Sequence, residues 1–406
     1  MSGILLIDHN RCSLAVARAM AGRGRDVYAG IDGPCDYLNL SRFVTRSLTM
    51  ADLVETPERA LADLNRIFAA YPEITGLFPV DETGVRFLTD HGAGLPDHVL
   101  QYVVAAETVR RVTDKSRAAK LAADCGIPVA PRITVDNFAD LKSAAADIGF
   151  PLVVRAVECN HDVYGVKVLV CHDRATFDAV CTDWPTEGHK QLMIQRYNAG
   201  GRHNLYWTAD RGRLHAGVNV EVGLTTAGDA SGYGTFARTI EPVPELADYA
   251  TRLVEALGYH GTGSAQFLLD KQTGEITFLE INPRLGANSK LVESVLPYID
   301  WFADLVEGTP LAHRPDPWAY KRGQRFVWLK GENQTYKKLL REKRYGQLVS
   351  RFGLSLWNSV GAVHGVFSPD DPLPALACHF NPVIRHLPKR LLPRLPQPVP
   401  EIVVAE

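Results

Sequence analysis

The stretch that decides the fold reads Phe278-Leu-Glu-Ile-Asn-Pro-Arg-Leu-Gly-Ala-Asn-Ser-Lys-Leu291. It opens as a strand, because its residues alternate with the period of two that sends successive side chains to opposite faces of a sheet. Glu280 and Asn282 therefore emerge from one face, and Pro283, which has no N–H, ends the pairing and leaves Arg284 beside them. The oxygens of Glu280 and Asn282 are suitable ligands for Mg²⁺, and the guanidinium of Arg284 is suited to a polyphosphate that such an ion would hold. The simpler alternative is an edge strand with a surface glutamate.

A second strand lies upstream, where Ser264-Ala-Gln-Phe-Leu-Leu-Asp270 is followed by the hairpin turn Lys271-Gln-Thr-Gly274. This order of motifs resembles the metal-binding hairpin of the ATP-grasp superfamily, in its carbamoyl-phosphate-synthase-like branch. The resemblance implies that the cofactors are ATP and Mg²⁺ (or Mn²⁺). It also implies that the metal is held by a Gln, a Glu and an Asn, which here are Gln266, Glu280 and Asn282.

The resemblance also implies the architecture, an α/β fold with an N-terminal Rossmann-like pre-ATP-grasp domain and a two-subdomain ATP-grasp module. We expect the first domain over residues 1–108 and the module over 109–310, with its lid subdomain at about 126–200. A basic C-terminal extension would then cover 311–406. The loop after the first strand lacks the Gly-x-Gly-x-x-Gly pattern, so NAD or FAD binding is not expected there.

Composition restricts the partners. The formal net charge of −2 over 406 residues argues against nucleic acid as a partner of the whole molecule, and no apolar run predicts a membrane span. Seven scattered cysteines without a CxxC pair are typical of reduced thiols, so a cytoplasmic protein is expected. A homodimer is common among the relatives that the resemblance suggests.

Two further cations are expected at the phosphates. Lys115 opens a helix where the ATP-grasp family places a basic residue that contacts ATP phosphate, although a solvated first-turn lysine is the alternative. Arg155 ends a buried strand that begins near Phe150, and a buried cation needs an anion such as a nucleotide phosphate. Arg284 completes this predicted set of phosphate-balancing, catalytic cations.

The loop expected to cover the phosphates, residues 157–165, is a departure from the family, because it has lost most of the usual Gly and Ser residues. Its backbone amides would cradle phosphate less freely, which puts turnover in question. His161 and Asp162 within it either add a substrate contact or form an ordinary surface pair.

The strand Gln191–Tyr197 resembles the one that lines the adenine pocket, where the backbone of Gln195, Arg196 and Tyr197 would contact the base. Relatives carry a Glu for the ribose hydroxyls, and this chain offers His203 and Asn204 instead.

The small-residue loop 223–234 is expected over the acyl-phosphate site, with Arg238 beyond it to neutralise a substrate carboxylate or phosphate. Asp81 and Glu82 follow a strand end and either contact substrate or cap a helix. Asn288, Ser289 and Lys290 are expected to face the same pocket.

The last part of the chain is basic, with fifteen Lys and Arg against seven Asp and Glu in residues 311–406. Lys337–Arg344 has a helical pattern, which predicts either a solvated helix face or a docking patch for an acidic carrier protein or an anionic membrane surface. Beyond Pro382 the density of Pro and Arg predicts an extended end.

Taken together, these features predict an ATP-dependent carboxylate–amine ligase that joins small molecules by an amide bond through an acyl phosphate, with release of ADP and phosphate. A bicarbonate- or carbamate-phosphorylating enzyme and a non-catalytic nucleotide-binding scaffold are the alternatives.

Overall fold

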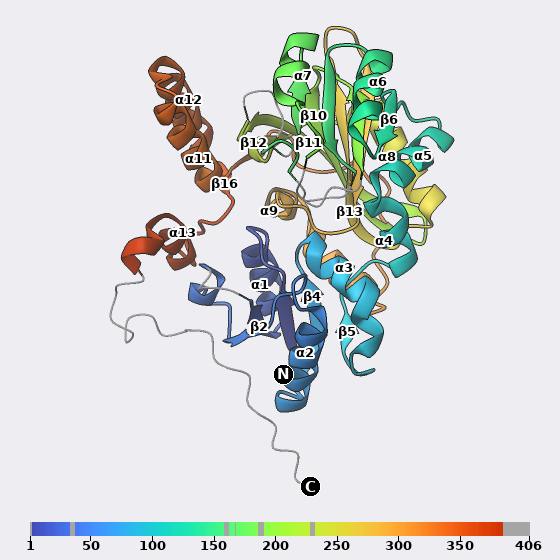
Figure 1. Ribbon diagram of the computed structural model, residues 1–406. Coiled ribbons are helices and arrows are strands. Elements are labelled where there is room, and N and C mark those ends of the chain that lie inside the picture. The colour runs from blue at the N-terminus through green and yellow to red at the C-terminus, as the bar shows by residue number, and fades with distance from the viewer. Residues whose placement is uncertain are drawn as a thin grey trace.

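The computed structural model of the protein describes residues 2–32, 37–157, 162–166, 168–185, 191–227 and 232–384, except for the side chains of 379–384. His161 and its neighbours 158–160 lie outside the described residues. So do the middle of the small-residue loop, 228–231, and the chain after residue 384. The predicted α/β class is confirmed, because one parallel sheet and two mainly antiparallel sheets are each packed against helices (Figure 1).

The N-terminal module is a five-stranded parallel sheet with the order β3-β2-β1-β4-β5. Its strands are β1 (Gly3–Ile7), β2 (Asp26–Ile31), β3 (Arg46–Thr49), β4 (Ile74–Pro79) and β5 (Leu100–Gln101). Its helices are α1 (Ser13–Gly22), α2 (Pro57–Ala70) and α3 (Glu82–His91), and two short 3-10 turns lie at η1 (Tyr37–Leu40) and η2 (Gly92–Gly94). The carboxyl ends of such strands present the loops that usually carry ligand contacts.

A four-stranded antiparallel sheet with the order β6-β9-β7-β8 forms the region expected to be the lid. Its elements are β6 (Arg132–Val135), α6 (Phe138–Ile148), β7 (Leu152–Ala156), β8 (Leu169–Cys171), α7 (Arg174–Val180) and β9 (Leu192–Arg196). Two helices precede it, α4 (Ala106–Thr113) and α5 (Lys115–Asp124). Asp114 caps α5 by accepting from the amides of Ser116 and Arg117, which fixes Lys115 in the first helical turn.

The central sheet has seven strands in the order β14-β13-β10-β11-β12-β15-β16. They are β10 (Gly201–Asp210), β11 (Arg213–Thr225), β12 (Gly234–Thr239), β13 (Gly261–Leu269), β14 (Ile276–Asn282), β15 (Arg325–Val327) and β16 (Val363–His364). The remaining helices are α8 (Pro244–Leu257), α9 (Ser289–Glu293), α10 (Tyr298–Val306), α11 (Leu329–Arg341), α12 (Tyr345–Ser359) and α13 (Leu373–Ile384). The C-terminal region thus contributes two strands, β15 and β16, to the sheet that carries the predicted metal strand.

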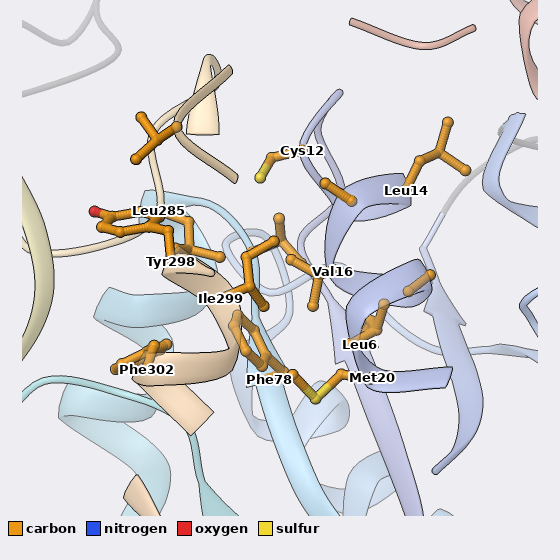
Figure 2. Close-up of a cluster of buried hydrophobic side chains, with 14 of the residues drawn as sticks. Leu6, Cys12, Leu14, Val16, Met20, Phe78, Leu285, Tyr298, Ile299 and Phe302 are labelled. Carbon is orange, nitrogen blue, oxygen red and sulfur yellow. The ribbon is translucent and has the colours of Figure 1, made fainter. Parts of the chain in front are cut away.

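A shared apolar core joins the N-terminal sheet to the central part of the molecule (Figure 2). Phe78 at the end of β4 stacks on Tyr102, with ring centroids 5.4 Å apart, and meets the edge of Phe302 from α10 at 5.6 Å. Leu6 from β1 and Ile299 from α10 are fully buried in the same cluster. This packing holds the carboxyl ends of β1 and β4 against the end of β14, which is where the candidate site lies.

We expect Phe302→Ala to lower the free energy of unfolding by about 3–5 kcal/mol, because it removes a buried ring and leaves a cavity between the two modules. Chemical denaturation monitors this change. Val54→Ala, at an exposed position of the N-terminal module, is the control and should leave the transition nearly unchanged. A loss below about 1 kcal/mol for Phe302→Ala would contradict the assigned role of this core.

Candidate active site

A cavity of about 400 Å³ opens where the three sheets meet, and its walls come from all of them. The N-terminal module contributes the loops after β1 and β4, the lid contributes β7 and β9, and the central sheet contributes β10, β13 and β14. Nine of the predicted site residues line it: Lys115, Arg155, Gln195, Arg196, Tyr197, Gln266, Glu280, Asn282 and Arg284. Residues that are up to 169 positions apart in the sequence are thus brought to one chamber.

The predicted metal ligands lie on two adjacent antiparallel strands. Gln266 on β13 is the direct cross-strand partner of Glu280 on β14. Asn282 lies two residues further along the same face, and its Nδ2 donates to Glu280 Oε1 at 3.2 Å. The pairing shifts register just beyond Gln266, so that Leu279 also lines the cavity beside Glu280. A bulge of this kind re-aims side chains, and it is often found beside active sites.

This donor set contains one carboxylate and two amide oxygens. Among the residues that the structure describes, no three His, Cys, Asp or Glu side chains gather as a metal cluster. Mg²⁺ does not need such a cage, because it is commonly bound through one or two carboxylates together with substrate phosphates. The side chains of Gln266, Glu280 and Asn282 therefore fit a nucleotide-bound Mg²⁺ better than a resident zinc or iron ion.

Positive charge exceeds negative charge in the cavity wall. Among the described residues of the wall there are six Lys and Arg and three Asp and Glu, namely Arg11, Lys115, Arg155, Arg196, Arg202 and Arg284 against Asp81, Glu82 and Glu280. Lys115 is buried, and its Nζ donates to the carbonyl oxygens of Ala156 and Val157 at 3.4 and 3.3 Å. Lys115 therefore lies against the end of β7, close to Arg155, which is an arrangement suited to a polyanion.

Arg284 is partly buried and is held by the N-terminal module. Its Nη2 lies 3.1 Å from Asp81 Oδ1 and 3.7 Å from Glu82 Oε2. Burial alone would lower the pKa of Arg284, but Asp81 and Glu82 raise it above its ordinary value. Asp81 also accepts from the amide of Glu82 at the start of α3. The helix cap expected of Asp81 is therefore present, and the same side chain lines the cavity.

Part of the cavity wall is apolar and is formed by Val153, Val168, Val170, Leu268 and Leu279. Gln195, Arg196 and Tyr197, which are expected to contact a base, also line the cavity. The amides of Arg196 and Tyr197 already donate to the carbonyl oxygens of Pro131 and Pro151. Those two donors are therefore not available to a base while the lid sheet is intact, and other groups of this segment must provide any polar contact.

His203 and Arg238 are not among the described residues that line the cavity. On β10, Asn204 faces the cavity, so its neighbour His203 points to the other side of the sheet. There the His203 ring lies 3.4 Å from the side-chain nitrogen of Asn219. Arg238 is half exposed and pairs with Glu221 at 2.7 Å. Of the two ribose candidates, the structure brings only Asn204 to the site.

The residues that follow β14 do not all face the cavity. Asn288 lines the cavity, whereas Lys290 turns away and its Nζ donates to the carbonyl oxygens of His364 and Phe367, at 2.6 and 2.8 Å. Burial lowers the pKa of Lys290 to about 7. Lys290 therefore fastens the C-terminal segment to α9 and does not face the pocket, contrary to expectation.

Two arginines that the sequence analysis did not select line the cavity. Arg11, in the loop after β1, donates to the carbonyl oxygen of Ala287 at 2.9 Å and to Asn288 Oδ1 at 2.8 Å. Burial lowers the pKa of Arg11 to about 10, which leaves it charged at neutral pH. Arg202 lies on the same face of β10 as Asn204 and donates to the carbonyl oxygen of Gly232 at 2.8 Å. The loop position of Arg11 and the strand alternation of Arg202 are the signals that could have identified them.

The described ends of two predicted loops can be placed. Gly232, Tyr233 and Gly234, at the end of the small-residue loop, line the cavity. Asp162, in the loop expected over the phosphates, is exposed.

The fold and one segment of the chain can be compared with known proteins. Residues 239–314 match the family described as the carbamoyl-phosphate synthase L chain, ATP binding domain. These residues include β13, β14 and all three predicted metal ligands. The resemblance seen in the sequence is thereby confirmed for this segment and for the fold.

The similar proteins agree with this assignment. The N-terminal section of the carbamoyl phosphate synthase large chain of Methanopyrus kandleri is 25% identical over 201 residues, which are 48% of this chain and 35% of that protein. The chain thus spans about a third of that relative.

Two solved structures share the fold. An L-amino acid ligase from Bacillus licheniformis has a TM-score of 0.63 at 15% identity, over 80% of this chain and 79% of that one. The biotin carboxylase domain of a Hydrogenobacter thermophilus 2-oxoglutarate carboxylase, solved with MgADP, ADP and bicarbonate, has a TM-score of 0.60 at 14% identity, over 79% and 72%.

The carboxyl group of Asp8 gives a pH-dependent test of the junction between the modules. Burial and the nearby Asp81 carboxylate raise the pKa of Asp8 to about 7, although its Oδ2 accepts from the amide of Gly84. The folded state therefore holds a proton that the unfolded chain releases near pH 4, so this group's contribution to stability falls as pH rises towards 7.

We expect Asp8→Asn to remove that dependence, because the amide stays neutral and can still accept from Gly84. Between pH 5 and 7, the variant should gain stability relative to the wild type by up to about 1.4 kcal/mol per pH unit. Denaturation at both pH values measures this gain, with the exposed Asp90→Asn as the control. If the free energy of unfolding changed equally with pH in Asp8→Asn and in the wild type, the claim that the folded state keeps Asp8 protonated would be contradicted.

Proposed function

We propose that the protein is an ATP-dependent carboxylate–amine ligase that forms an amide through an acyl phosphate and releases ADP and phosphate. One observation carries this proposal. Gln266, Glu280 and Asn282 lie side by side on paired strands, in the same cavity as the buried Lys115 and the half-buried Arg155. Hard oxygen donors opposite a cationic wall are the arrangement that phosphoryl transfer from ATP requires.

The reaction class follows from the chemistry of the substrates. A carboxylate does not react with an amine at neutral pH, because oxide is a poor leaving group. Transfer of the γ-phosphoryl group to a carboxylate oxygen breaks the bond to ADP and forms an acyl phosphate. The amine then attacks the acyl carbon, phosphate leaves, and the ammonium proton is released. Positioning and charge neutralisation are what the protein must supply.

The residues divide this work among them. Lys115 and Arg155 would balance the phosphates, and the apolar walls around Val153 and Leu279 would take the base. Gln266, Glu280 and Asn282 would hold Mg²⁺, which supplies charge neutralisation at the phosphates when it is bound. No side chain has to form a covalent bond with the substrate.

The part of the cavity beside the turn between β14 and α9 would receive the substrates, because side chains of both charges line it. Arg11 and Arg202 can bind an anionic carboxylate there, since neither has an ion-pair partner among the residues that the structure describes. Asp81 and Glu82 can attract a cationic amine before it loses its proton, although they also hold Arg284. This polarity favours small, charged substrates such as amino acids.

Bicarbonate or carbamate phosphorylation is the second candidate, and the match of residues 239–314 to a carbamoyl-phosphate synthase domain favours it. The two reactions differ in which substrates are needed for ADP release. The ligase requires an organic acid and an amine together, whereas the second candidate requires bicarbonate and no organic acid.

We also infer a cytoplasmic location, because the described cysteines, Cys12, Cys125, Cys171, Cys181 and Cys378, form no disulfide.

We expect Glu280→Gln to lower the turnover of ADP release about 100-fold to 1,000-fold, because it removes the one carboxylate from the predicted metal site. The assay measures ADP with panels of amino acids as paired acid and amine substrates. Glu221→Gln is the matched control, since Glu221 lies outside the cavity lining and pairs with Arg238 and Lys271.

The outcomes separate the candidates. Release that depends on both an acid and an amine, and that is lost only in Glu280→Gln, supports the ligase. Release with bicarbonate alone supports the second candidate. Tight ATP binding without ADP release under any condition would overturn both and leave a non-catalytic scaffold. Unchanged turnover in Glu280→Gln would contradict the metal assignment.

A further inference from the structure

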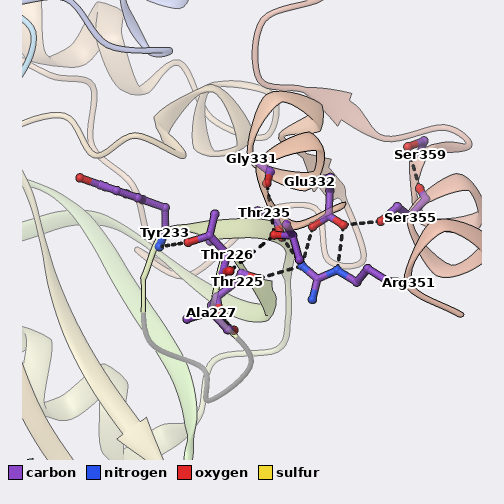
Figure 3. Close-up of polar contacts among 12 residues, drawn as sticks. Thr225, Thr226, Ala227, Tyr233, Thr235, Gly331, Glu332, Arg351, Ser355 and Ser359 are labelled. Carbon is purple, nitrogen blue, oxygen red and sulfur yellow. Dashed lines mark hydrogen bonds and ion pairs between the residues drawn. The ribbon is translucent and has the colours of Figure 1, made fainter. Parts of the chain in front are cut away.

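Helix α12 is turned so that its polar side faces the protein. Arg351 donates to both carboxylate oxygens of the buried Glu332 on α11, at 2.8 and 2.6 Å, and to Thr235 Oγ1 at 3.0 Å (Figure 3). Ser355, one turn further along, donates to the same carboxylate at 2.6 Å. Arg351 also donates to the carbonyl oxygen of Thr225 on β11, so the hairpin of α11 and α12 is fastened to the central sheet.

The opposite side of α12 is apolar and faces outward. We call it the outer apolar stripe, and its members are Tyr345, Val349, Phe352, Leu356, Trp357 and Val360. The spacing of 345, 349, 352, 356 and 360 places these positions on one helical face. Val349 and Trp357 are each 72% exposed, and no Asp, Glu, Lys or Arg interrupts the stripe.

This exposure is concentrated in one place. Of the sixteen large apolar side chains that are exposed in the described part of the chain, eight lie between Leu340 and Val360. The hairpin stands at the outer edge of the molecule (Figure 1). Rotation of α12 to bury the stripe would pull Arg351 away from Glu332 and leave that carboxylate buried without its partner. The outward orientation is therefore built into the fold, and a contiguous apolar surface of this kind indicates an interaction site.

The surroundings of the stripe are strongly basic. Five exposed cations form what we call the basic hairpin cluster: Lys337, Lys338, Arg341, Lys343 and Arg344. The one acid within this segment is Glu342, which pairs with Arg344 at 3.0 Å. A second copy of the chain would bring two such clusters near each other, which like charges disfavour. An acidic protein would match the cations but would not explain an uncharged stripe that runs the length of the helix.

An anionic lipid surface matches both features. An interfacial helix typically buries Trp, Phe and Leu at the boundary between headgroups and acyl chains, with Lys and Arg placed to meet anionic headgroups. No helix among the described residues has the length and apolar character to cross a bilayer, so contact at the surface is the mode that fits. We propose that the hairpin of α11 and α12 docks the protein on an anionic bilayer, with the outer apolar stripe in the interface and the basic hairpin cluster on the headgroups.

Vesicle co-sedimentation of the full chain tests this proposal, with phosphatidylcholine vesicles that contain or lack 30% phosphatidylserine. We expect at least about tenfold tighter partitioning to the anionic vesicles, since each cation near the surface strengthens binding about fivefold. Phe352→Ser with Trp357→Ser should weaken it at least about tenfold. Glutamine at Lys337, Lys338, Arg341 and Lys343 should do the same and remove the salt dependence.

Matched controls keep the result interpretable. Val54→Ser with Leu100→Ser removes two exposed apolar side chains elsewhere and should partition like the wild type. Circular dichroism melting should show every variant folded, because all the substituted side chains face solvent. Trp357→Phe should keep binding but lose the blue shift of tryptophan fluorescence that insertion causes.

Three results would overturn the proposal. The first is an absence of partitioning to either kind of vesicle. The second is binding lost by the glutamine variant but fully retained by Phe352→Ser with Trp357→Ser, which would indicate an acidic protein partner. The third is a wild-type dimer in sedimentation equilibrium that this apolar variant dissociates while neither binds vesicles, which would assign the stripe to a second copy.

Discussion

Pairing of β13 with β14 places Gln266 directly opposite Glu280, and the rest of the site depends on this one register. A slip by a single residue would send Glu280 and Asn282 to the opposite face of the sheet, away from Gln266 and the cavity. The end of β14 then sets the position of Arg284, and the turn after it sets the carbonyl oxygen of Ala287, to which Arg11 donates. Strand pairing thus fixes both the proposed metal site and the neighbouring cations.

The N-terminal module contributes charged side chains to the cavity wall. It supplies Asp81 and Glu82 as partners of the partly buried Arg284, while its own Arg11 reaches across to the turn after β14. Buried charges of this kind are costly unless they are paired, so the two modules have to sit in one relative position. The apolar contacts of Phe78 with Phe302 support the same arrangement. Under the proposed function, a site that spans the modules in this way would bring phosphates and small substrates together in one cavity.

Much of the site could be predicted from the sequence because its main signals are local. Alternation along β14 identified Glu280 and Asn282, and the motif order identified Gln266, Lys115 and Arg155. The same rule, applied to β10, would have shown that His203 and Asn204 cannot both face the site. The loop position of Arg11 was a usable signal, but its hydrogen bond to Asn288 could not be predicted, since 277 positions of sequence separate the two residues. The orientations of Lys290 and of helix α12 could not be predicted, because they depend on hydrogen bonds from Lys290 to His364 and from Arg351 to Glu332.

The central claim is that Gln266, Glu280 and Asn282 share one divalent ion with a nucleotide. Anomalous diffraction from a crystal grown with Mn²⁺ and a non-hydrolysable ATP analogue tests it most directly. The account predicts one strong peak about 2–2.5 Å from an oxygen of each of the three side chains, with the triphosphate between it and Lys115. A nucleotide bound in the cavity with its ion held elsewhere, and these three side chains free of it, would contradict the account.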